Sequence, residues 1–138
     1  MTAAATAMEA VAQEQGLLVL AADDDEIVLG LVVYRLEHSG YRVIAAHDGE
    51  EALTLALARR PALAVLDVMM PGLNGYEVTR LLRSYDATRA LPIILLTARA
   101  EDADSERALD AGADEYLAKP FSPEQLRSRV EALLARAA

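Results

Sequence analysis

The chain has 138 residues, which suits one compact domain, with a net charge of −9 and no cysteine. The acidic balance argues against direct, non-specific binding to nucleic acid, and the lack of cysteine excludes disulfides and thiol chemistry, as is usual in a reducing compartment. No apolar run approaches the roughly 20 residues that span a bilayer, and no basic residue precedes Arg35 as a secretory signal requires, so we expect a cytoplasmic protein without a membrane segment.

Residues 1–16 are rich in alanine and carry neither turn signals nor a strand pattern. A short helix from Met8 to Gln15 is compatible with their composition, but none of these side chains suggests chemistry. We therefore treat residues 1–16 as an N-terminal extension and expect the domain to occupy residues 17–138.

From residue 17 onward, short apolar runs alternate five times with stretches of helical periodicity. The runs predict strands, and the periodic stretches, bounded by acids, serine, proline or glycine, predict helices. The expected elements are strand 17–22, helix 27–39, strand 41–46, helix 50–60, strand 62–68, helix 76–85, strand 93–96, helix 102–111, strand 115–118 and helix 122–136. This alternation indicates a mainly parallel sheet with helices on both faces.

The strand expected at residues 62–68 is a continuous apolar run with one carboxylate, Asp67, shortly before a Pro71–Gly72 turn. An uninterrupted run of this kind is typical of a strand that is buried on both faces of a parallel sheet. Asp67 is thus expected near the carboxyl end of a central strand, at the edge where open α/β sheets bind ligands. A carboxylate in that position is costly to bury unless another group pairs with it.

Three other strands are also followed by polar residues at their carboxyl ends. The first ends at Asp23 and Asp24, the fourth at Thr97 and the fifth at Lys119. The carboxyl ends of parallel strands share one edge, so three carboxylates converge there if the first strand is central. Two carboxylates about 4 Å apart repel each other by about 4 kcal/mol at an effective dielectric near 20. Mg²⁺, which prefers oxygen ligands and retains waters, would relieve the repulsion and leave room for a phosphoryl group.

A dinucleotide-binding domain is the other doubly wound alternative. That reading needs a G-x-G-x-x-G motif directly after the first strand, where backbone amides approach a pyrophosphate. This chain has Asp23-Asp24-Asp25 at that place, and these acids would repel a pyrophosphate. The dinucleotide interpretation is therefore rejected.

The ordered set of motifs resembles the receiver domain of bacterial response regulators, the phospho-accepting half of two-component signalling. The segments that carry the resemblance are Asp23-Asp24, Leu66 to Gly72 with Asn74 to Glu77, Thr97-Ala98 and Lys119 to Phe121. The resemblance covers about residues 17–136. It implies a flavodoxin-like (βα)5 fold, with a doubly wound parallel five-stranded sheet of order 2-1-3-4-5, and a cis Lys119–Pro120 peptide bond.

The resemblance also implies which residues bind the metal and the phosphoryl group. Asp67 would attack the phosphoryl group carried on a histidine of a sensor kinase or phosphotransfer protein, which gives an acyl phosphate. Asp24, Asp67 and the backbone carbonyl of Met69 would be direct Mg²⁺ ligands. Asp23 would reach the ion through a water molecule.

The resemblance further implies how the phosphoryl group would act as a switch. Thr97 would donate its hydroxyl to a phosphoryl oxygen, while Lys119 would pair with Asp67 at rest and with the phosphoryl group afterwards. In this family an aromatic side chain at the position of Tyr116 swings inward as the threonine moves. The surface expected to change consists of helix 102–111, strand 115–118 and helix 122–136. It would bind an output domain, an effector protein or a second copy of the chain.

Two alternative functions would use the same residues. A metal-dependent phosphohydrolase with an aspartyl-phosphate commonly has a second aspartate two residues after its nucleophile, where this chain has Met69. A degenerate receiver that no longer takes phosphate would not be expected to keep the full polar set. We therefore predict a signalling phospho-acceptor that catalyses only its own phosphoryl transfer and dephosphorylation, without direct contact to nucleic acid or membrane.

Overall fold

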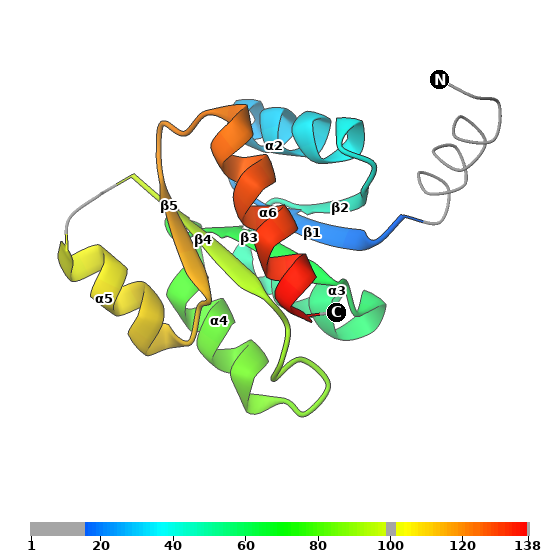
Figure 1. Cartoon of the computed structure of the whole chain (residues 1–138). Helices are drawn as coiled ribbons and strands as arrows, with labels where there is room; N and C mark the ends of the chain where they lie inside the picture. Colours follow the sequence, from blue (N-terminus) through cyan, green and yellow to red (C-terminus); the bar gives the residue numbers. More distant parts are fainter. Residues whose placement is uncertain (1–15, 99–101, 138) are drawn as a thin grey trace, which may run out of the picture.

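The computed structural model describes residues 16–98 and 102–137 (Figure 1). Five parallel strands form one sheet in the order β2-β1-β3-β4-β5, which confirms the predicted flavodoxin-like topology. The strands are β1 Leu18–Ala22, β2 Arg42–Ala46, β3 Leu63–Asp67, β4 Ile93–Thr97 and β5 Glu115–Ala118. The helices are α2 Glu26–His38, α3 Gly49–Arg59, α4 Gly75–Ser84, α5 Asp102–Ala111 and α6 Pro123–Ala137.

Helices cover both faces of the sheet (Figure 1). Successive residues of a strand point to opposite faces, so Val19 and Ala21 belong to one core cluster while Leu20 and Ala22 belong to the other. The first cluster includes apolar side chains of α2 and α6, and the second includes side chains of α3, α4 and α5. Every residue of β3 and β4 is buried. Burial on both faces explains why these strands read as continuous apolar runs.

Local side-chain bonds determine where three of the helices begin. The Asp25 carboxylate caps α2, because it accepts hydrogen bonds from the backbone amides of Ile27 at 2.9 Å and Val28 at 3.2 Å. Asn74 and Glu77 form a reciprocal capping box at the start of α4. Ser122 and Gln125 exchange equivalent bonds at the start of α6, directly before Pro123 in the first helical position. The predicted role of Ser122 as the cap of the last helix is confirmed.

The observed elements differ from the predicted ones by no more than one residue at any end. One of these differences affects the site, because Gly75 was predicted in a loop and instead lies in the first turn of α4. The Lys119–Pro120 peptide bond is cis, as predicted. The short helix predicted at residues 8–15 lies outside the described residues. Within the described part of the chain, no helix is long and apolar enough to cross a membrane.

Candidate functional site

The carboxyl ends of four strands meet at one edge of the sheet and bring the predicted polar residues together. Asp23 follows β1, Asp67 ends β3, Thr97 ends β4 and Lys119 follows β5. The strand register holds this arrangement, because the last residue of β4 pairs with the last residue of β5. Asp23, Asp67 and Thr97 are 1%, 4% and 5% exposed, so three polar side chains are buried at this edge.

Lys119 connects the two buried carboxylates. Its Nζ atom donates to Oδ2 of Asp23 and to Oδ1 of Asp67, both at 3.0 Å. Its backbone amide also donates to the carbonyl oxygen of Thr97 at 2.7 Å, which attaches the end of β5 to the end of β4. A single ammonium group therefore partly compensates two carboxylates that would otherwise be costly to bury.

Three carboxylates lie close enough to share a metal ion. Ligand oxygens of Asp23, Asp24 and Asp67 all lie within 4.8 Å of one another. Asp23 already uses both oxygens, because Oδ1 accepts the amide of Asp25 at 2.9 Å and Oδ2 accepts Lys119. Asp24 is exposed, so its carboxylate has acceptor positions left. Hard divalent cations prefer such a set of carboxylate oxygens, and the donor set therefore fits Mg²⁺.

Burial and charge shift the pKa values of Asp67 and Lys119. Burial raises the pKa of Asp67 to about 6; the hydrogen bond from Lys119 acts in the opposite direction, and the charge of Asp23 adds to the increase. For Lys119, burial lowers the pKa, but the hydrogen bonds to both carboxylates outweigh it and raise the pKa overall. Asp67 thus remains mostly ionised at neutral pH and can act as a nucleophile.

Gly75 lets the start of α4 pack directly against the carboxyl end of β3. A Cβ atom at this position would lie 2.5 Å from the carbonyl oxygen of Asp67, and the Gly75 amide donates to the Val68 carbonyl at 2.9 Å. Sequence reasoning missed this contact because it assigned Gly75 to a loop. The capping box between Asn74 and Glu77 was the available signal, since it predicts a helix that begins at Gly75.

The remaining predicted positions lie around this centre. Met69, two residues beyond Asp67, has a side chain that is 71% exposed, and its backbone acts to lower the pKa of the Asp67 carboxyl, against the effect of burial. Tyr116 is half-buried in β5 beside Leu95 of β4. Arg129 pairs with Glu115 at 2.9 Å within the same chain.

Comparisons with known proteins agree with this geometry. The model of the response regulator receiver domain family matches residues 19–131. The alkaline phosphatase synthesis transcriptional regulatory protein PhoP of Bacillus subtilis is 48% identical over 118 residues, which cover 86% of this chain and 48% of PhoP. The chain thus spans about half the length of the curated relatives that it matches.

Solved structures show the same fold. The receiver domain of the Francisella response regulator 1452 superposes with a TM-score of 0.84 at 34% identity, covering 89% of this chain and 100% of that domain. The receiver domain of the sensor histidine kinase PA1611 from Pseudomonas aeruginosa superposes with a TM-score of 0.82 at 34% identity, covering 87% of this chain and 98% of that chain. That second structure has a magnesium ion coordinated in its active-site cleft.

Proposed function

The chain belongs to the response-regulator receiver family, and on this premise we propose that Asp67 accepts a phosphoryl group from the phosphohistidine of a sensor kinase or phosphotransfer protein. The observation that carries the proposal is the position of Lys119, 3.0 Å from both Asp23 and Asp67. A buried carboxylate with an ammonium group beside it combines a nucleophile with a charge that can follow the transferred group.

In the proposed reaction, an oxygen of the Asp67 carboxylate attacks the phosphorus atom. The new P–O bond gives an acyl phosphate while the P–N bond to the donor histidine breaks and its electron pair stays on the imidazole. Asp24, Asp67 and the Met69 carbonyl would hold Mg²⁺, with Asp23 bound through water; each oxygen of Asp23 already accepts one hydrogen bond in this structure. The bound ion would supply neutralisation of charge on the phosphoryl oxygens.

Thr97 and Lys119 would then contact the transferred group. Both lie at the ends of their strands, so movement toward the phosphoryl oxygens would displace the segments that follow β4 and β5. Tyr116 would move inward with Thr97. The surface that changes is the one formed by α5, β5 and α6, which we name the α5-β5-α6 surface.

The α5-β5-α6 surface is the proposed contact for an output domain, an effector protein or a second copy of the chain. PhoP of B. subtilis is a transcriptional regulatory protein about twice as long as the matched region. By analogy, residues 17–138 would act as a cytoplasmic receiver that controls such an output, with residues 1–16 as an extension. The receiver itself would contact neither nucleic acid nor membrane.

Treatment with acetyl phosphate and Mg²⁺, followed by intact-mass measurement, tests the proposal. We expect a gain of one phosphoryl group, lost in Asp67→Asn and retained in Asp110→Asn, which changes an exposed aspartate outside the site. Multiple turnover on small phosphate esters would instead support a phosphohydrolase. Absence of an adduct on the unmodified chain would support a receiver that no longer takes phosphate.

A further inference from the structure

A cation–π contact joins α5, one element of the α5-β5-α6 surface, to α4. The guanidinium carbon of Arg107 lies 4.6 Å from the centroid of the Tyr76 ring. Tyr76 is only 4% exposed, whereas Arg107 is an exposed residue, so the arginine covers a buried ring from outside. Contacts with this geometry attract the cation to the negative face of the ring.

Tyr76 lies next to a residue that packs directly against Asp67. It directly follows Gly75, whose amide donates to the Val68 carbonyl at 2.9 Å and whose Cα leaves no room for a side chain beside the Asp67 carbonyl. A contiguous set of packed groups therefore runs from Asp67 through the start of α4 to Arg107 on α5. This path does not include Thr97 or Tyr116.

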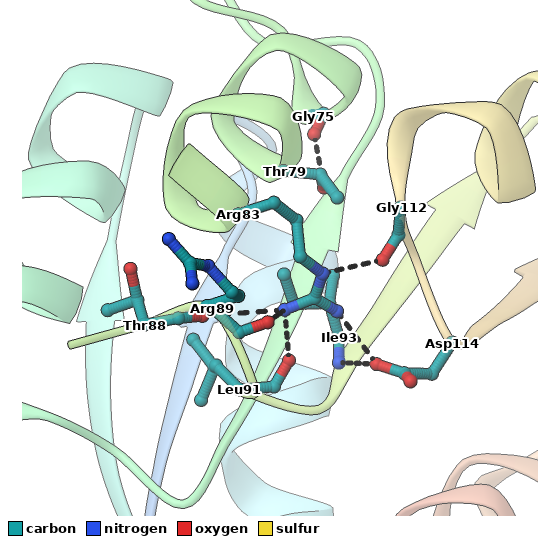
Figure 2. Close-up of polar contacts among 9 residues, drawn as sticks. All are labelled: Gly75, Thr79, Arg83, Thr88, Arg89, Leu91, Ile93, Gly112 and Asp114. Atoms are coloured by element: carbon teal, nitrogen blue, oxygen red, sulfur yellow. Dashed lines mark hydrogen bonds and ion pairs between the residues drawn. The ribbon is translucent and has the colours of Figure 1, made fainter. Parts of the chain in front are cut away.

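The C-terminal end of α5 is held in a different way, by a cluster of hydrogen bonds around Arg83 of α4. Figure 2 shows the Arg83 guanidinium between the α4–β4 loop and the turn that follows α5. It donates to the Gly112 carbonyl at 2.8 Å, to the Leu91 carbonyl at 2.6 Å and to Oδ2 of Asp114 at 2.9 Å. The same Oδ2 atom accepts the Ile93 amide at 2.8 Å. We name this cluster the Arg83 anchor.

Between these attachments, α5 has little apolar surface to hold it. Of its described side chains, residues 106–111, only Ala108 and Ala111 are buried, and Leu109 is 59% exposed. Two alanines contribute a small buried area compared with the leucines and valines of the other helices. Among the described side chains of α5, residues 106–111, the contact of Arg107 with Tyr76 therefore adds to the packing of two alanines in holding the helix.

We propose that the Arg107–Tyr76 contact is a latch that holds α5 against α4 in the unphosphorylated protein and opens when the α5-β5-α6 surface switches. This inference rests on the proposed function. The structure has Lys119 bonded to Asp67, which is the arrangement before phosphoryl transfer, so the contact stabilises that state. Among the described residues, the Arg83 anchor has several hydrogen bonds and the latch is one contact, so we expect α5 to move about its C-terminal end.

Removing the latch is expected to change the affinity for a phosphoryl mimic in one direction only. A contact made in only one of two states shifts the equilibrium toward that state, and its loss favours the other. The strength of an exposed cation–π contact corresponds to a change of about two- to five-fold in the population of the switched state. The apparent affinity for a phosphoryl mimic, which selects the switched state, rises by the same factor when the latch is removed.

The test uses the full chain, Mg²⁺ and beryllofluoride, with binding followed by ¹⁹F NMR. Arg107→Gln and Tyr76→Leu are expected to bind beryllofluoride about two- to five-fold more tightly than the unmodified chain. The double variant should bind no more tightly than either single variant, because both remove the same contact. Arg80→Gln removes an exposed guanidinium of α4 and is the matched control. This control variant should bind beryllofluoride like the unmodified chain.

Amide hydrogen exchange over residues 102–111, without beryllofluoride, provides a readout that does not depend on phosphate chemistry. Exchange in α5 should become faster in Arg107→Gln and remain unchanged in Arg80→Gln. Unchanged exchange and unchanged or weaker beryllofluoride affinity in Arg107→Gln would overturn the latch. If the unmodified chain forms no adduct with beryllofluoride or acetyl phosphate, the proposed function fails, and the exchange measurement still decides whether the latch exists.

Discussion

Replacing Asp67, the proposed phospho-acceptor, by asparagine should change how the stability of the protein depends on pH. Asp67 has a pKa of about 6 in the folded chain against an ordinary value of 3.8. The folded state therefore binds this proton more tightly than the unfolded state does. The resulting stabilisation is fully present below about pH 3.8 and is lost as the pH rises through about 6.

The magnitude follows from the two pKa values. One pKa unit corresponds to about 1.36 kcal/mol, so the ionisation of Asp67 lowers the free energy of unfolding by up to about 3 kcal/mol between pH 4 and pH 7. Asp67→Asn lacks this ionisation. The free energy of unfolding of the variant minus that of the unmodified chain should thus increase by up to about 3 kcal/mol over the same range.

Urea unfolding at several pH values between 4 and 7, with EDTA present, measures this difference. Carboxylates remote from Asp67 titrate in both proteins and cancel from the difference. Adding Mg²⁺ at pH 7 should stabilise the unmodified chain more than Asp67→Asn, since the ion compensates the charge that the variant lacks. A difference that stays flat from pH 4 to pH 7 would refute the assignment of a raised pKa to Asp67.

Three further substitutions test the packing and pairing around the site, each by urea unfolding at pH 7. Lys119→Met leaves two buried carboxylates without their cation and should cost about 3 kcal/mol, with part of the loss restored by Mg²⁺. Gly75→Ala should lower the free energy of unfolding by about 1–3 kcal/mol, because the added Cβ atom meets the carbonyl oxygen of Asp67. Gly30→Ala is the contrasting case: a Cβ atom there meets nothing within 4 Å, and the substitution should stabilise α2 by about 0.5–1 kcal/mol. Arg83→Gln should cost at least about 2 kcal/mol through unsatisfied carbonyls, while Arg80→Gln should change little.

Elements whose signals are local were predictable from the sequence. The apolar run ending in Asp67 predicted a strand buried on both faces, and Ser122 before Pro123 predicted the start of the last helix; both are observed. Such signals lie within a few residues of one another.

The order of the strands could not be predicted from local signals alone. The periodicity of the sequence predicted a parallel sheet, and only the resemblance to receiver domains implied which strand lies beside which.

Contacts between distant residues could not be predicted in this way. In the Arg83 anchor, Arg83 bonds to Gly112 and Asp114, which lie 29 and 31 positions further along the sequence. Nothing in the sequence around Arg83 distinguishes it from Arg80, which lies one turn earlier in α4 and is exposed. The latch depends on how α5 crosses α4, which follows from packing. The raised pKa of Asp67 also required the structure, since it results chiefly from burial.

The balance of charge at the sheet edge explains why one lysine can serve both states of the site. At rest, three carboxylates face one ammonium, which leaves a formal charge of −2 that a divalent cation would complement. Formation of the acyl phosphate removes the charge of the Asp67 carboxylate and adds about −1.5 to −2 on the phosphoryl oxygens. The negative charge would thus grow by about 0.5 to 1 unit and move away from the Asp67 carboxylate. In the proposed switch, Lys119 would follow this charge while its bond to Asp23 persists, and a small displacement of charge would thereby displace the end of β5.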